Sequence, residues 1–121
     1  MTFTLRQSVE ASLNRAHLDR FAVRAARWLR NTHAEAAAGL SDEQLAAQAR
    51  RTCGFASVYG LRTELEIFRF FASTVLLQDP LLPGSPAREA VELLSDRRVP
   101  ASLRAYRTWQ WAMKTKGISH A

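Results

Sequence analysis

The sequence contains a single cysteine, Cys53, and no long uninterrupted run of apolar residues. One cysteine cannot form a disulfide within the chain, so the fold must hold without one. Charged residues interrupt the apolar stretches before any reaches the roughly 20 residues that a membrane-spanning helix needs. The N-terminal residues also lack the basic-then-apolar layout of a secretory signal. We therefore expect a cytoplasmic protein with no membrane segment.

Lysine and acidic residues are both scarce relative to arginine. Seventeen residues are Lys or Arg, 11 are Asp or Glu, and the formal net charge is +6. Fifteen of the 17 cations are Arg, which favours planar, bidentate contacts. From Arg97 to Ala121 there are six basic residues and no acidic one. This balance suits a nucleic acid or an acidic protein partner, but a bias in coding composition would produce it as well.

Recognisable catalytic and cofactor motifs are missing. His17, His33 and His120 lie in different segments without ligand-like spacing, and the chain has no HExxH, Walker, GxGxxG or GxSxG sequence. Cys53 falls on an apolar stripe, where a small core residue is the simpler interpretation. The paired carboxylates at 42–43 and 64–66 lie in expected first turns of helices, where they complement the helix dipole. We therefore expect no enzyme activity, metal site or cofactor.

The pattern of apolar residues predicts an all-α fold. No stretch alternates apolar and polar residues with β-branched enrichment, and 121 residues is the size of one domain. We expect a single-domain, compact helical bundle of about five to six helices over residues 1–121, with residues 116–121 as a flexible tail. A first helical region is predicted from about Leu5 to Leu29, and a break near Asn14 is left open. Leu5, Val9 and Leu13 recur on one face. Arg20, Arg24 and Arg27 are expected to form a solvated face, with a partner-binding surface as the alternative.

Two capping boxes mark helix starts. Ser41 with Gln44, and Thr63 with Glu66, have the spacing at which the two side chains satisfy each other's backbone N–H groups. The helix after Ser41 is expected to end at Gly60, where glycine supplies a left-handed residue. Further along, Ser85 and Pro86 read as the N-cap and first residue of a short helix. Pro100 is expected to open the last helix and Gly117 to close it.

The helix that follows Thr63 is apolar around most of its circumference. One predicted face consists of Leu65, Phe68, Ala72, Val75 and Leu76, and Ile67, Phe70, Phe71 and Leu77 widen it. Such a helix is typical of the centre of a bundle, so its phenylalanines are predicted to form core rather than an aromatic ligand site. Glu66, Arg69 and Ser73 form the polar strip, on which Glu66 and Arg69 can pair.

The last helix carries the candidate functional site. Leu103, Tyr106, Trp109 and Met113 share one side, which suits packing. Trp111 projects from the other side, where Arg104, Arg107 and Lys114 flank it on the helical wheel. This group can stack on nucleic-acid bases or anchor a protein interface. Alternatively, Arg107 lies over the Trp111 ring in a contact within the chain.

The order of these signals resembles a known group of proteins. A Phe-x-x-Arg helix ending in Trp28-Leu29-Arg30 is followed by a capped helix from Ser41, Tyr59-Gly60-Leu61, Glu64, the phenylalanine-rich helix and Asp79-Pro80. The arrangement from Phe3 to Asp96 is similar to the small helical proteins encoded beside PAAR-type spike tips and toxic effectors in bacterial type VI secretion loci. Those proteins often have Gly after the aromatic helix and Trp after the next Pro, where this chain has Thr74–Leu77 and Pro83-Gly84. The basic end beyond Arg97 is also outside their pattern.

The resemblance implies a genomic setting and a protein-binding role, and it supplies no catalytic residue. We therefore expect a non-catalytic accessory protein, acting as adaptor or chaperone for a type VI secretion effector or spike component. The partner-binding residues are predicted to be Arg104, Arg107, Trp111 and Lys114. The first alternative is an immunity protein that neutralises a cognate toxin, although the basic charge disfavours a cationic target. The second is a basic helical protein that binds nucleic acid.

Overall fold

The computed structural model describes the backbone of residues 2–117 and the side chains of residues 15–117. The chain is 75% helical, and residues 2–117 contain six α-helices and no strand, which confirms the predicted all-α fold. Within this range no helix is both long and apolar enough to cross a membrane. Residues 118–121, which include most of the predicted tail, lie outside the described part.

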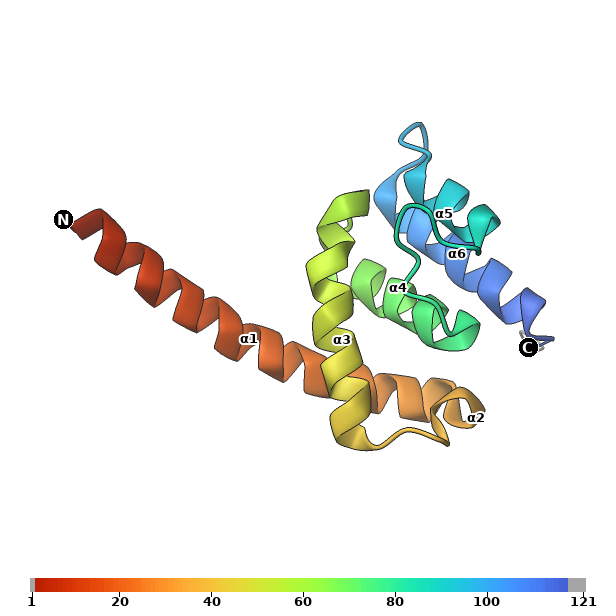
Figure 1. Cartoon of the computed structure of the whole chain (residues 1–121), viewed down its shortest axis with the longest axis horizontal. Helices are drawn as coiled ribbons and strands as arrows, with labels where there is room; N and C mark the ends of the chain where they lie inside the picture. Colours follow the sequence, from red (N-terminus) through yellow and green to blue (C-terminus); the bar gives the residue numbers. More distant parts are fainter. Residues whose placement is uncertain (1, 118–121) are drawn as a thin grey trace.

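The helices form a bundle around α4 (Figure 1). Helix α4 packs against α6 on one side and α3 on the other, and it also touches α1 and α2. Helix α5 packs on α6, and these are the last two helices in the sequence. In chain order the elements are α1 (Thr2–Thr32), α2 (Ala34–Ala37), α3 (Asp42–Ala56), the 3-10 turn η1 (Ser57–Tyr59), α4 (Glu64–Leu77), α5 (Arg88–Ser95) and α6 (Ala101–Thr115).

Helix α1 is one continuous helix, so the chain has no break near Asn14. Its N-terminal part extends away from the other helices, and its C-terminal part lies across α3 (Figure 1). All three arginines of the predicted row are exposed, and Arg24 forms a two-bond pair with Glu64 of α4 at 2.9 Å. The opposite face is buried in the bundle. The predicted face formed by Leu5, Val9 and Leu13 lies outside the described side chains.

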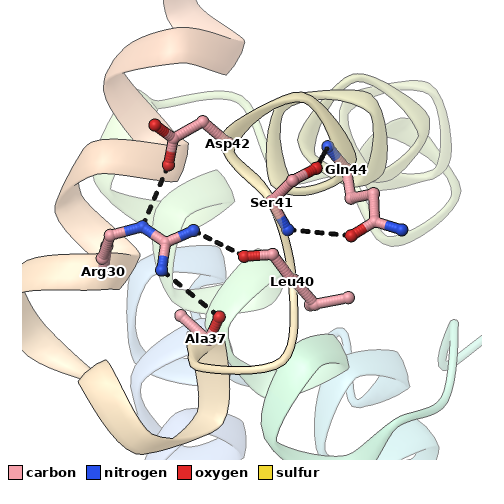
Figure 2. Close-up of polar contacts among 6 residues, drawn as sticks. All are labelled: Arg30, Ala37, Leu40, Ser41, Asp42 and Gln44. Atoms are coloured by element: carbon pink, nitrogen blue, oxygen red, sulfur yellow. Dashed lines mark hydrogen bonds and ion pairs between the residues drawn. The ribbon is translucent and has the colours of Figure 1, made fainter.

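Arg30, near the end of α1, connects this helix to the start of α3 (Figure 2). Arg30 Nε donates to Asp42 Oδ1 at 3.0 Å, and its two terminal nitrogens donate to the carbonyl oxygens of Ala37 at 3.4 Å and Leu40 at 2.7 Å. Ala37 is the last residue of α2, and its carbonyl also accepts from Leu40 N at 3.0 Å. Leu40 lies in the turn that links α2 to α3, where the helical ladder leaves acceptors without donors. The guanidinium therefore donates hydrogen bonds to the carbonyl groups of this segment and fixes the direction of α3 relative to α1.

Both predicted capping boxes are present. Ser41 Oγ accepts from Gln44 N at 3.1 Å, and Gln44 Oε1 accepts from Ser41 N at 2.8 Å (Figure 2). Thr63 and Glu66 make the same reciprocal pair at the start of α4. Gly60 follows η1 with φ +70°, which confirms the predicted left-handed glycine. These local signals place the beginnings of α3 and α4 at the predicted residues.

The phenylalanines of α4 form the core, as predicted. Phe70 and Phe71 are neighbours in sequence but pack into two different clusters, and both are almost completely buried. Phe71 packs with residues of α1 and α3, including Leu29 and Leu45. Phe70 packs with Tyr59 and with residues of α5 and α6. Helix α4 therefore joins the two halves of the bundle.

Two assignments on α4 are wrong. Leu65, predicted to face the core, is 52% exposed, because it lies in the first turn on a side that no neighbouring helix covers. The polar strip does not face solvent: Glu66 and Ser73 are buried. Glu66 does not pair with Arg69, because its carboxylate turns back to accept from the backbone N–H groups of Arg62 at 2.9 Å and Thr63 at 3.4 Å.

The start of α5 also differs from the prediction. The helix begins at Arg88 with Ala87 at its N-cap, rather than with Ser85 at that position. Ser85 Oγ instead donates to Asp79 Oδ1 at 2.6 Å and accepts from Ala87 N at 3.0 Å. Asp79 Oδ1 also accepts from Leu81 N, so the serine is part of the loop before α5. Helix α6 starts directly after Pro100, and Gly117 follows it with φ +71°, as predicted.

Candidate functional site

The four predicted partner-binding residues do not share one surface, because Arg104 is buried. Only 5% of Arg104 is exposed. Its Nε donates to the carbonyl oxygen of Val99 at 2.9 Å, and one terminal nitrogen donates to those of Tyr59 and Leu94, both at 2.6 Å. The prediction that Arg104 lies beside Trp111 on an exposed face is therefore wrong.

The three acceptors of Arg104 explain its position. Tyr59 is the last residue of η1 and Leu94 lies in the last turn of α5. Carbonyl groups at the end of a helix have no N–H donor within that helix. The negative ends of two helices therefore converge on one guanidinium. Arg104 joins η1, α5 and the loop before α6, and its role is to hold these segments together.

Arg107 and Trp111 remain at the surface, where they line a groove between α5 and α6. The groove has a volume of about 750 Å³. Arg107 is exposed and Trp111 is half-buried, with its ring packed against the core cluster that contains Phe70. Lys114 is exposed but does not line the groove. The other lining residues are Glu89, Glu92, Leu93, Ser95, Asp96, Arg98 and Val99.

The groove carries charges of both signs. Arg98 pairs with Asp96 at 2.9 Å, and the pKa of Asp96 is lowered by hydrogen bonds from Arg98 and by the positive charges of Arg98 and Arg107. Glu89 and Glu92 on the α5 wall are exposed and form no ion pair with any described residue. The sequence prediction missed this acidic wall because Trp111 was placed only relative to residues of its own helix.

The predicted alternative in which Arg107 covers the Trp111 ring is not found. Among the described side chains, the cation–π contacts join Arg24 to Phe21 and Arg69 to Tyr106 and Trp109. Trp111 therefore has no stacked cation from its own chain in this part of the structure.

A second group of aromatic residues lies on the other side of α6. Trp28 of α1 stacks on Phe68 of α4, with ring centroids 5.3 Å apart, and lies 6.2 Å from Trp109 of α6. Tyr106 meets Trp109 edge-on at 6.2 Å. All four rings are half-buried. The sequence indicated a packing side for Tyr106 and Trp109, but nothing in it indicated that Trp28, from the first helix, would join them.

His33 is buried within this aromatic group. The side chain is 7% exposed, and its Nε2 accepts a hydrogen bond from Trp109 Nε1 at 2.9 Å. An acceptor nitrogen must be unprotonated, so the contact selects the neutral imidazole. Burial also lowers the pKa of His33. The histidine that links α1 and α2 is therefore held neutral against α6.

This arrangement predicts a specific pH dependence of stability. The folded-state pKa of His33 lies below the ordinary value of 6.5, so the unfolded chain takes up the proton first as the pH falls. The free energy of unfolding should therefore decrease as the pH falls below about 6.5. Urea denaturation at pH 7.5 and 5.5 measures this loss. Glutamine at position 33 keeps an acceptor but does not titrate, so His33→Gln should reduce the loss. An equal loss in wild type and His33→Gln would contradict this account.

Other reactive groups are not assembled into a site in the described part of the chain. Burial raises the pKa of the Cys53 thiol to about 11, so the sulfur is protonated at neutral pH. Among the described residues no group of three or more His, Cys, Asp or Glu side chains is placed to hold a metal ion. His17 is exposed on α1, and His120 lies outside the described residues.

Comparison with protein-family models, with curated proteins and with solved structures finds no match to this chain.

Proposed function

We propose that this chain is a non-catalytic protein-binding module that holds a segment of its partner in the groove between α5 and α6. The observation that carries the proposal is the placement of Trp111 and Arg107 on one wall and, on the other, of Glu89 and Glu92, which form no ion pair with a described residue. Tryptophan and arginine are the residue types most enriched among the strong contacts of protein interfaces. The Trp111 ring is half-buried and packs against the core, so it is already held in place. It therefore loses little conformational entropy when a partner binds.

The charges of the groove favour a protein over a nucleic acid. A polyanion would gain from Arg107 and Arg98 but would be repelled by Glu89, Glu92 and Asp96 around the same groove, and Arg98 is already paired with Asp96. A protein segment can present cations to the α5 wall and an acidic group to Arg107. The net charge of +6 therefore does not by itself indicate nucleic-acid binding, because the groove is locally mixed.

The narrower form of the proposal is an adaptor or chaperone for a type VI secretion effector or spike component. It is supported by the resemblance of residues 3–96 to accessory proteins of those loci. In that setting the partner is the protein encoded by the adjacent gene, and this chain acts in the cytoplasm before secretion.

Replacing Trp111 with alanine and Arg107 with glutamate should weaken binding to the adjacent gene product by about tenfold or more. The double variant removes the ring and reverses the charge on one wall of the groove. Calorimetric titration of the purified pair measures the change. The matched control is Val23→Ala with Arg20→Glu, which makes the same charge change and removes an exposed apolar side chain from α1.

Arg107→Glu alone keeps the test valid if the loss of the half-buried ring disturbs folding, since Arg107 is exposed. Unchanged affinity in both groove variants would exclude this groove as the binding surface. Protection of cells that express the adjacent gene product as a toxin would indicate the immunity role instead. Binding to labelled DNA or RNA with a steep loss as salt rises would indicate the nucleic-acid alternative.

A further inference from the structure

Three arginines in the described part of the chain are at least partly buried: Arg30, Arg69 and Arg104. Arg30 donates to two carbonyl oxygens and one carboxylate (Figure 2), and Arg104 donates to three carbonyl oxygens. Arg69 differs, because no described residue accepts a hydrogen bond from its guanidinium, and its Nε is buried without a partner. A buried N–H group with no acceptor is costly, so the Nε of Arg69 calls for an explanation.

The surroundings of Arg69 are aromatic. Its guanidinium carbon lies 4.8 Å from the centre of the Tyr106 ring and 5.6 Å from that of Trp109. The nearby carboxylates of α4 are occupied elsewhere: Glu66 caps its own helix, and Glu64 forms a two-bond pair with Arg24 at 2.9 Å. The rings therefore hold the guanidinium in place, but no described carboxylate neutralises it.

The terminal nitrogens of Arg69 are available to a ligand, because only Nε is buried without a partner. The Tyr106 and Trp109 rings are inclined at 63° to each other, so the guanidinium can lie flat over only one of them. The ligand that matches these terminal N–H groups is a planar anion that accepts two parallel hydrogen bonds. The site is therefore suited to a carboxylate.

The margin of this site is apolar. Leu65 lies one turn before Arg69 on α4 and is 52% exposed, and Leu103 lies one turn before Tyr106 on α6 and is 37% exposed. Phosphate groups are usually held by clustered arginines or by a helix N-terminus. The described contacts of the Arg69 guanidinium are with rings alone, so a single negative charge next to apolar surface fits better than a phosphate.

We propose that Arg69, with Tyr106 and the exposed Leu65 and Leu103, forms a second binding site that takes a carboxylate of a protein partner together with an adjoining apolar side chain. The site lies on the α4 side of α6, whereas the groove of the proposed function lies on the α5 side. It therefore goes beyond the proposed function, and its test does not depend on the identity of the partner.

The test uses N-acetylphenylalanine, which carries a carboxylate beside an apolar ring. The full chain labelled with ¹⁵N is titrated with this compound while the Arg69 side-chain Nε–H and Trp109 indole signals are followed. Saturable shifts in both signals in the millimolar range are expected. N-acetylphenylalanine amide has the same shape without the charge and should leave the signals unchanged. Phenyl phosphate should bind more weakly than the carboxylate.

Variants separate this site from the groove. Arg69→Gln should reduce the affinity for N-acetylphenylalanine by about tenfold or more, and Arg69→Lys should restore only part of it, because an ammonium lacks the two-pronged geometry. Arg107→Gln in the groove should leave the affinity unchanged. If Arg69→Gln fails to fold, the wild-type titration still decides the matter. The proposal is overturned if the carboxylate produces no saturable shift, if the amide binds equally well, or if phenyl phosphate binds more tightly.

Discussion

Arg104→Ala should lower the free energy of unfolding by about 3–5 kcal/mol, because it removes the shared donor of three carbonyl groups and leaves them buried without it. The carbonyls belong to the end of η1, the last turn of α5 and the loop before α6, so three segments lose their common contact at once. Denaturation with urea, followed by circular dichroism at 222 nm, measures the change.

The matched control for this result is Arg107→Ala. Arg107 lies one turn further along α6, is exposed and makes no described hydrogen bond, so its removal should change stability by only about 0.5 kcal/mol or less. Arg104→Lys should lie between the two, since an ammonium keeps the charge but cannot reach three acceptors in the same geometry. Equal stability of Arg104→Ala and Arg107→Ala would show that Arg104 does not hold the segments together.

Phe70→Ala should destabilise the chain by a similar amount, about 3–5 kcal/mol. The ring is fully buried and meets Tyr59 edge-on, with centroids 5.7 Å apart, in the cluster that joins α4 to α5 and α6. Its loss would remove that contact and leave a cavity where the two halves of the bundle meet. Thermal and urea unfolding both measure the effect, and the transition should remain cooperative if the bundle is one unit.

The comparison for Phe70 is made on the same helix. Leu65→Ala removes a large apolar side chain that is 52% exposed, so its cost should be far smaller, within about 1 kcal/mol. The sequence pattern alone predicts that both Leu65 and Phe70 lie in the core. Similar losses from Phe70→Ala and Leu65→Ala would contradict the arrangement of α4 described above.

The parts of the fold that sequence predicted correctly are those fixed by local chemistry. The capping boxes at Ser41 and Thr63 and the left-handed residue at Gly60 depend on groups within a few residues of one another, so spacing is enough to find them. The central position of α4 followed from apolar coverage of most of its circumference, which few other arrangements can bury.

The errors share a physical cause, which is contact with residues distant in sequence. A helical wheel places Arg104 with other cations on the surface, but its acceptors come from positions 59, 94 and 99. Ser85 has the chemistry of an N-cap but is engaged by Asp79 across the loop. In both cases tertiary hydrogen bonds overrode a valid local preference, and no local signal distinguishes the two outcomes.

The candidate site was predicted only in part for the same reason. Trp111 and Arg107 were identified from their own helix, and both line the groove. The acidic residues opposite them, Glu89 and Glu92, could not be assigned to the groove until α5 was placed against α6. The Arg69 site was hidden because Glu66, its expected partner, has the right spacing but caps its own helix instead.

The most direct test of protein binding at the groove is site-specific photocrosslinking. Benzoylphenylalanine is introduced at position 111 or, as a control, at position 20 on the exposed face of α1, and each protein is irradiated with the adjacent gene product. The account predicts a covalent product from position 111 and none from position 20. A product from position 20 with none from position 111 would contradict it.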